Sequence, residues 1–136
     1  MNRLAVIVSR GELNSLVQVS TLLMAAVGSG LAVSVFFRDE AIFGITRAGA
    51  PPRFSEGYRG KEAQVRAELE RQGLADVPEL LRQIKELGGA RLYACSSSMA
   101  ICAVTPEELL PEIDAVRGLT SFLLDDVAAA DHVLTF

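Results

Sequence analysis

Cys95 stands at the end of a short apolar segment and is followed at once by three serines, Ser96, Ser97 and Ser98. If the apolar segment is a strand and the serines open a helix, free backbone N–H groups and the positive end of the helix dipole favour the thiolate form of Cys95. The serine hydroxyls can cap such a helix or donate hydrogen bonds to an anionic sulfur. The pattern predicts a nucleophilic, reachable thiol of lowered pKa, and the alternative is a buried and inert cysteine.

The second cysteine, Cys102, lies two helical turns beyond Cys95, which corresponds to about 10 Å of axial rise. A disulfide between the two would require this helix to unwind. We therefore interpret Cys102 as a core residue shielded by packing, and the alternative is a resolving thiol.

His132 is the only histidine in the chain and opens the last predicted strand. It should therefore lie at the edge of the sheet opposite to Cys95, where we expect a structural role. This placement disfavours a cysteine–histidine nucleophile pair. One histidine and two cysteines are also too few for a zinc site, so we expect no metal.

The element order follows from the apolar runs. Residues 4–9 form a continuous apolar run typical of a strand covered on both faces, residues 13–27 have helical spacing, and residues 31–37 form a second strand. A strand, a helix and a strand with short links predict parallel pairing with a right-handed crossover. The uncharged stretch 13–37 is long enough to span a membrane, but Gly28, Gly30 and several polar residues divide it, so we expect no membrane segment.

The remaining chain continues this alternation. Its predicted elements are a short helix over 38–46, a helix over 61–72, a helix from about 76 to 87, a strand over 90–95, a helix over 96–103, a short strand over 113–116, a helix over 120–130 and a last strand over 132–136. The fold class is α/β, with an open, mainly parallel five-stranded sheet. Neither a G-x-G-x-x-G motif nor a phosphate-binding loop motif occurs, so we expect no nucleotide or other cofactor.

Residues 47–60 contain two prolines and three glycines, a composition typical of a surface loop. We expect this loop to be mobile. Its arginines, Arg47, Arg53 and Arg59, could fold over an anionic substrate as a lid, and the alternative is a solvated loop.

Ligands of open parallel sheets bind outside the carboxyl ends of the strands. The first strand ends at Arg10, the second at Arg38 and the fourth at Arg117, so one edge should gather the Cys95 thiol and three guanidinium groups. We expect Arg10 and Arg38 to attract an anionic donor or an acidic partner. Together with Ser96, Ser97 and Ser98, they are the predicted substrate-binding residues.

The composition limits the class of protein. At 136 residues, 50% hydrophobic and 22% charged, the chain is expected to fold as a single domain over residues 1–136. A formal charge of −4 provides no basic surface for nucleic acid. Two cysteines without disulfide spacing and an N-terminus without signal-peptide features indicate a cytoplasmic protein.

Four segments, 4–16, 33–37, 92–99 and 113–123, resemble proteins of the DsrE/DsrF-like family, and the likeness spans nearly the whole chain. Its most specific part is the Ala-Cys-x-x-Ser-Met pattern at 94–99. The resemblance implies a three-layer α/β/α fold, a persulfide-carrying role for Cys95, and sulfur relay or related thiol chemistry. Some relatives are described as peroxiredoxin-like.

The sequence is compatible with two functions. The first is a sulfur-relay protein or sulfurtransferase that holds sulfane sulfur on Cys95 and exchanges it with donor and acceptor proteins or small thiols. The second is a non-catalytic, oligomeric module of the same fold that binds a small ligand or a protein, with Cys95 only lining a pocket. The reactivity of the Cys95 thiol distinguishes them, and whether the protein is an enzyme depends on the same property.

The resemblance and the high apolar fraction of the chain predict a homo-trimer or homo-hexamer, because apolar surface left over from one core is buried against another copy. Light scattering near neutral pH should give the mass of such an assembly. A monomer in dilute solution would contradict this prediction.

Overall fold

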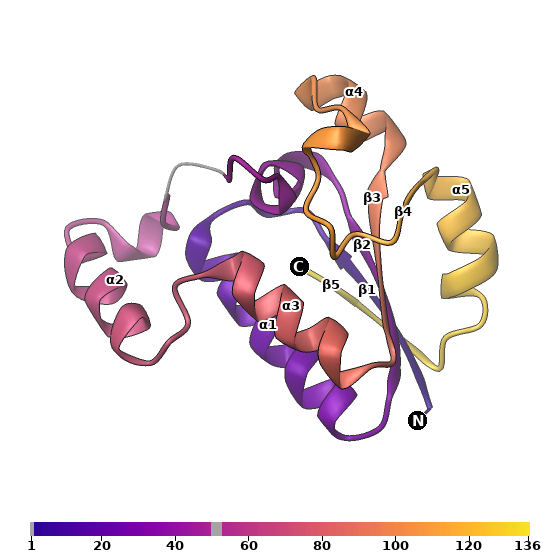
Figure 1. Cartoon of the computed structure of the whole chain (residues 1–136), viewed down its shortest axis with the longest axis horizontal. Helices are drawn as coiled ribbons and strands as arrows, with labels where there is room; N and C mark the ends of the chain where they lie inside the picture. The colour runs from indigo at the N-terminus through magenta and orange to yellow at the C-terminus, as the bar shows by residue number, and fades with distance from the viewer. Residues whose placement is uncertain (1, 50–52) are drawn as a thin grey trace.

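The computed structural model describes residues 2–49 and 53–136. Its five strands form one sheet in the order β4-β3-β2-β1-β5, and all neighbouring pairs are parallel (Figure 1). The strands are β1 (Arg3–Val8), β2 (Ala32–Phe37), β3 (Ala90–Cys95), β4 (Ala115–Arg117) and β5 (His132–Thr135). The predicted five-stranded α/β fold is confirmed, and the sheet is entirely rather than mainly parallel.

The first face of the sheet carries the main core. Helices α1 (Leu13–Gly28) and α3 (Val77–Leu87) lie side by side on this face (Figure 1). Alternate strand residues such as Val6, Val35 and Leu92 are fully buried beneath them. Helix α3 begins where the sequence predicts, because the Asp76 carboxylate accepts a hydrogen bond from the backbone N–H of Glu79.

The carboxyl edge of the sheet is covered by short helices. The 3₁₀ helix η1 (Asp39–Ile45) contacts α4 (Ser96–Cys102), and η3 (Pro106–Glu108) precedes β4. The link from β1 to α1 passes close to η1 at Gly11, where a Cβ atom would lie 2.6 Å from the Glu40 carbonyl oxygen. Only glycine allows this approach.

The second face of the sheet has a thinner cover. A helical turn, α5 (Leu119–Ser121), continues into the π-helical η4 (Phe122–Val127), and this segment lies on the opposite side of the sheet from α1 and α3 (Figure 1). Phe122 is completely buried; its ring stacks on Phe36 with centroids 4.7 Å apart and meets the Tyr93 ring edge-on at 6.2 Å. The layers are therefore α/β/α, with one short helical segment as the third layer.

The fourth strand differs from the prediction. Pairing begins at Ala115 rather than at residue 113, because the Asp114 carboxylate accepts the backbone N–H of Leu92 at 2.7 Å. A side chain thus occupies a position that a strand carbonyl would otherwise take. The predicted helix over 120–130 is also changed: it begins at Leu119 and widens into the π-helical turn.

The predicted loop over 47–60 is anchored in its second half. The backbone N–H of Leu13 donates to the Arg53 carbonyl at 2.7 Å, and Asn14 and Ser55 exchange two hydrogen bonds of 2.9 Å each. Arg53 also pairs with Glu40 at 2.8 Å. These contacts hold the chain to the start of α1 just before η2 (Glu56–Tyr58) and α2 (Glu62–Arg71), while residues 50–52 lie outside the described residues.

The two ends of the described chain lie at opposite edges of the sheet. Asn2 and Arg3 donate backbone hydrogen bonds to the Asp131 carboxylate at the amino edge. At the carboxyl edge, Phe136 donates to the Ile7 carbonyl and accepts from the Ser9 N–H, both at 2.8 Å. Over residues 2–49 and 53–136, no helix is both long and apolar enough to cross a membrane.

We predict that Phe122→Ala lowers the free energy of unfolding by about 3–5 kcal/mol, because it removes a fully buried ring that holds the third layer to the sheet. Urea unfolding measures this loss. Phe43→Ala, at a side chain that is 42% exposed, is the matched control and should cost less than about 1 kcal/mol. Equal losses in the two variants would contradict the prediction.

Candidate functional site

The sheet brings several of the predicted residues to its carboxyl edge. Cys95 is the last residue of β3 and lies opposite Arg117 of β4 in the ladder. Arg38 directly follows Phe37, the neighbour of Ala94, and so lies next to Cys95 on the β2 side. Arg10 is exposed beyond the end of β1, which is separated from β3 by β2. The edge therefore brings Cys95, Arg38 and Arg117 together and leaves Arg10 further away.

Cys95 is also the residue from which α4 begins, with extended backbone angles (φ −71°, ψ 121°). Its Sγ lies 3.2 Å from the Ser97 Oγ. Burial raises the pKa of the Cys95 thiol, but hydrogen bonds from the hydroxyls and backbone N–H groups of Ser97 and Ser98 outweigh this effect. The pKa of Cys95 is therefore lowered, as the strand-to-helix pattern predicts.

The three serines of α4 have different surroundings. Ser97 is exposed and approaches the sulfur, and Ser96 is exposed without taking part in the stabilisation of the thiolate. Ser98 is buried, and its Oγ accepts the backbone N–H of Asp39 at 2.8 Å, which ties α4 to η1. Of the three hydroxyls, that of Ser97 is thus the exposed one beside the sulfur.

The predicted direct accessibility of Cys95 is wrong for the single chain. Its relative exposure is 0%, and it packs with Phe36, Tyr93 and Phe122 on the second face of the sheet. Alternation along β3 causes this, because Tyr93 and Cys95 point to the face that α5 and η4 cover. A reagent therefore reaches the sulfur only after side chains around Cys95 move.

Cys102 is more exposed than the sequence predicts. It packs against the edge of the main core but is only partly buried, so it is not fully shielded as the sequence predicts. Its Sγ lies 3.7 Å from the Asp39 carbonyl oxygen. Burial and the nearby Asp39 carboxylate raise the pKa of Cys102, so this thiol is more exposed but less acidic than Cys95.

Arg117 connects the helical cover to the sheet. Its guanidinium lies 4.8 Å from the centre of the Tyr93 ring and pairs with Asp125 at 2.7 Å and with Asp126. These partners engage Arg117, so it is not a free cation for a substrate. Sequence reasoning missed the pairing, because it depends on which helical segment packs beside the end of β4. The alternation of side chains along β4 could have predicted that Arg117 faces the second layer, because it places Arg117 on the same face of the sheet as Cys95.

The geometry supports thiolate chemistry more than other kinds. Cys95 has an acidified thiol, and Arg38 provides a cation at the same edge that takes part in no ion pair among the described residues. His132 opens β5 opposite Leu4 at the amino edge, as predicted, and cannot act as a base for Cys95. Within residues 2–49 and 53–136, no group of three or more His, Cys, Asp or Glu side chains could hold a metal ion.

Comparisons with known proteins agree with this fold. A solved structure, that of MTH1491 from Methanobacterium thermoautotrophicum, described as a protein of unknown function, superposes with a TM-score of 0.65. It is 14% identical, and the match covers 98% of this chain and 99% of the other. No curated protein matches the sequence. The model of the DsrE/DsrF-like family matches residues 3–136, and the chain therefore belongs to the DsrE/DsrF-like family.

Proposed function

We propose that this protein, acting as one domain over residues 1–136, is a sulfur-relay protein or sulfurtransferase that carries sulfane sulfur as a persulfide on Cys95. The observation that carries the proposal is the placement of Cys95 at the turn from β3 into α4, with its Sγ 3.2 Å from the Ser97 Oγ, and the lowered pKa of the Cys95 thiol is consistent with it. A thiolate is the nucleophilic form of cysteine, and membership of the DsrE/DsrF-like family is consistent with sulfur relay.

The transfer is a pair of thiol exchange steps. The Cys95 thiolate attacks the outer sulfur of a persulfide or polysulfide donor, a new S–S bond forms at Sγ, and the donor leaves as a thiolate. An acceptor thiolate then attacks the outer sulfur of the Cys95 persulfide, and Cys95 leaves as a thiolate. No external oxidant or reductant is needed, and the donor and acceptor are other proteins or small thiols.

Loading requires the helical cover to move. Phe122 packs beside Cys95 on the second face, and Arg117 ties the same segment to β4 through Asp125 and Asp126. The segment is short and partly π-helical, a form of helix that is frequent at functional sites. In this proposal, displacement of α5 and η4 opens the way to the sulfur, and Arg38 attracts an anionic donor to the edge.

The complete burial of Cys95 favours a second candidate function. In this alternative the protein is a non-catalytic oligomeric module that binds a small ligand or a protein, and Cys95 is a core residue. The two candidates differ in one measurable property: the alternative requires that Cys95 takes up no sulfur from any donor.

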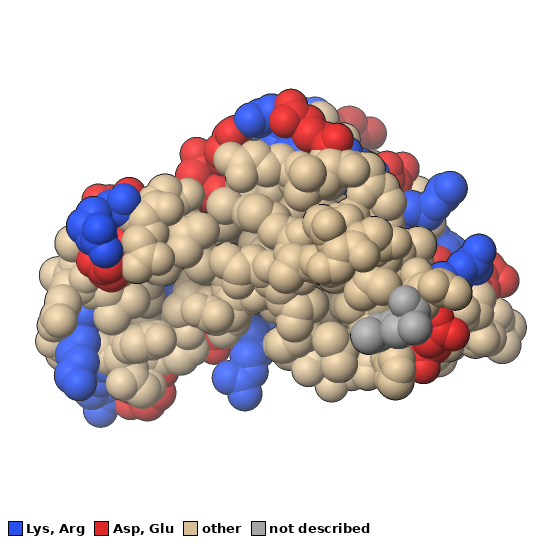
Figure 2. Space-filling view, turned by 90° about the horizontal axis from the view of Figure 1, so that it is seen from below, with Lys and Arg blue, Asp and Glu red and all other residues tan. Residues whose placement is uncertain are grey.

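We further propose that the chain assembles as a homo-trimer or homo-hexamer. Figure 2 shows a broad uncharged surface with most acidic and basic residues around its rim. Helix α1 carries no charged residue, and an apolar hollow of about 440 Å³ lies between α1 and β5. Large apolar side chains are also exposed elsewhere, including Ile101 at 83% and Leu124 at 70%. Burial of such surface in an assembly supports this part of the proposal.

Incubation with polysulfide should add the mass of one or more sulfur atoms to Cys95, detected by mass spectrometry of the intact protein and its peptides. Cys95→Ser should abolish this added mass while the protein stays folded, because serine is nearly isosteric with cysteine. Cys102→Ser is the matched control and should load sulfur as the unchanged protein does. Loading of Cys95→Ser at the unchanged level would refute the carrier role. Absence of loading in every variant, with polysulfide and with a thiosulfate-type donor, would favour the binding-module alternative over the carrier role.

Ser97→Ala should raise the pKa of Cys95, because it removes the hydroxyl that lies 3.2 Å from the sulfur. The thiolate absorbance against pH measures this change in a Cys102→Ser background, where Cys95 is the only thiol. Ser96→Ala is the matched control and should leave the pKa unchanged, because Ser96 does not contribute to the lowered pKa. Equal pKa values in the two variants would show that Ser97 does not stabilise the thiolate.

A further inference from the structure

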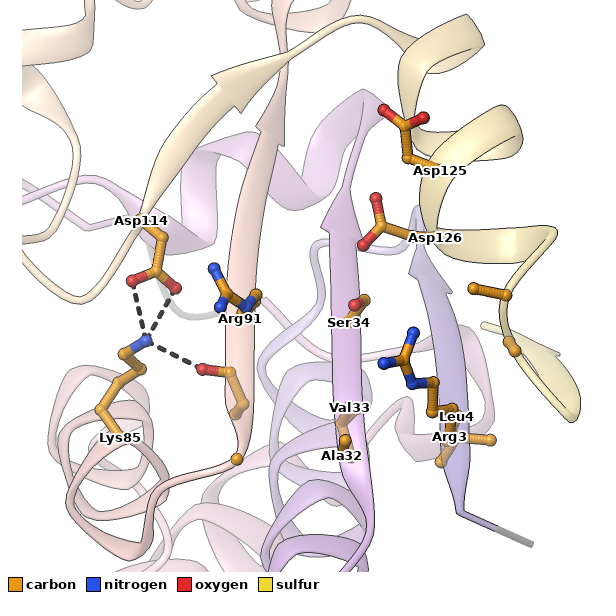
Figure 3. Close-up of a pocket in the computed structure, with 14 residues that line it drawn as sticks. Arg3, Leu4, Ala32, Val33, Ser34, Lys85, Arg91, Asp114, Asp125 and Asp126 are labelled. Carbon is orange, nitrogen blue, oxygen red and sulfur yellow. Dashed lines mark hydrogen bonds and ion pairs between the residues drawn. The ribbon is translucent and has the colours of Figure 1, made fainter.

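A pocket of about 690 Å³ opens on the second face of the sheet at the amino ends of the strands, the opposite edge from Cys95 (Figure 3). Its volume lies within the range of small-molecule sites, about 300–1,000 Å³. The polar side chains that line it are Arg3, Ser34, Lys85, Arg91, Asp114, Asp125 and Asp126.

Three neighbouring strands supply the floor of this pocket. Arg3, Ser34 and Arg91 each lie two residues before a side chain of the second-face core, on β1, β2 and β3 respectively. Side chains two residues apart in a strand point to the same face, so all three project on the pocket side. Ser34 lies opposite Arg91 in the ladder, and Figure 3 shows the two arginines on either side of Ser34.

Two cations of the pocket keep an unpaired charge. Lys85 Nζ is neutralised by the Asp114 carboxylate, with contacts of 2.7 and 2.8 Å. Asp125 and Asp126 are both paired with Arg117. Over residues 2–49 and 53–136, neither Arg3 nor Arg91 forms a side-chain ion pair, and the Ser34 hydroxyl has no hydrogen-bond partner. The remaining residues, 1 and 50–52, contain no acidic side chain that could pair with them.

We infer that this pocket binds a small organic molecule with two anionic groups, one held by Arg3 and the other by Arg91. A guanidinium binds carboxylate or phosphate oxygens through two parallel hydrogen bonds. Strands β1 and β3 are separated by β2 and lie about 10 Å apart. Arg3 lies two residues nearer the amino end of the sheet than Ala5, the β1 residue level with Ser34 and Arg91, and two long arginine side chains can close this diagonal distance around a short dianion. The Ser34 hydroxyl lies between them and can donate to the middle of the ligand.

Titration of isotope-labelled protein with succinate tests this inference by NMR. The amide resonances of Ser34 and Arg91 should shift and saturate, because both residues lie on the pocket floor. Succinamate, in which one carboxylate is replaced by an amide, should bind about 10-fold more weakly. Arg3→Gln and Arg91→Gln should each weaken succinate binding by about 10-fold for the same reason.

Arg47→Gln is the matched control, because Arg47 is an exposed arginine that does not line the pocket, and it should bind succinate as the unchanged protein does. Absence of a saturable shift at Ser34, equal affinity for succinate and succinamate, or equal affinity of Arg91→Gln and Arg47→Gln would each overturn the inference. Cys95→Ser should retain the binding, so this result is independent of the proposed sulfur transfer.

Discussion

The parallel pairing of β3 between β2 and β4 determines where the chemical groups of this protein lie. It places the end of β3 at the same edge as the ends of its neighbours, and it fixes which β3 side chains face which layer. Leu92 and Ala94 enter the main core, whereas Tyr93 and Cys95 enter the smaller one. A shift of one residue would exchange these two sets and remove the thiol from its present surroundings.

The second core is small, and this has two opposing effects. Its large rings, Phe36, Tyr93 and Phe122, pack closely enough to exclude water from the Cys95 sulfur. Among the described residues, one short segment, α5 and η4, covers the outer side of this core. Besides the ring contacts of Phe122, the ion pairs of Arg117 with Asp125 and Asp126 hold this segment to the sheet. A layer with few buried contacts opens locally at low cost in free energy. The burial of the sulfur therefore depends on a few side chains of one short segment.

The sequence predicted the strands and the turn at Cys95 correctly where the local apolar pattern matches the burial of the side chains. The apolar runs at 4–9, 31–37 and 90–95 are typical of strands covered on both faces, and the stop of one such run before three serines predicted the turn at Cys95. The exposure of the Cys95 and Cys102 thiols could not be predicted in this way, because it depends on which face of the sheet a helix distant in sequence covers. The Asp114 contact with Leu92 and the ties of Arg53 and Ser55 to α1 are likewise long-range contacts that periodicity does not encode.

The positions of the two chain ends allow the two edges of the sheet to be observed separately. Phe136 bonds to Ile7 and Ser9 at the carboxyl edge, and Asn2 bonds to Asp131 at the amino edge. A fluorophore fused after Phe136 would therefore lie at the carboxyl edge, on the far side of β1 and β2 from Cys95, and one fused before Asn2 would lie at the amino edge, where Arg3 lines the pocket. A bulky affinity tag is better placed before Asn2 in any study of Cys95, because a tag after Phe136 would emerge at the same edge of the sheet as the end of β3.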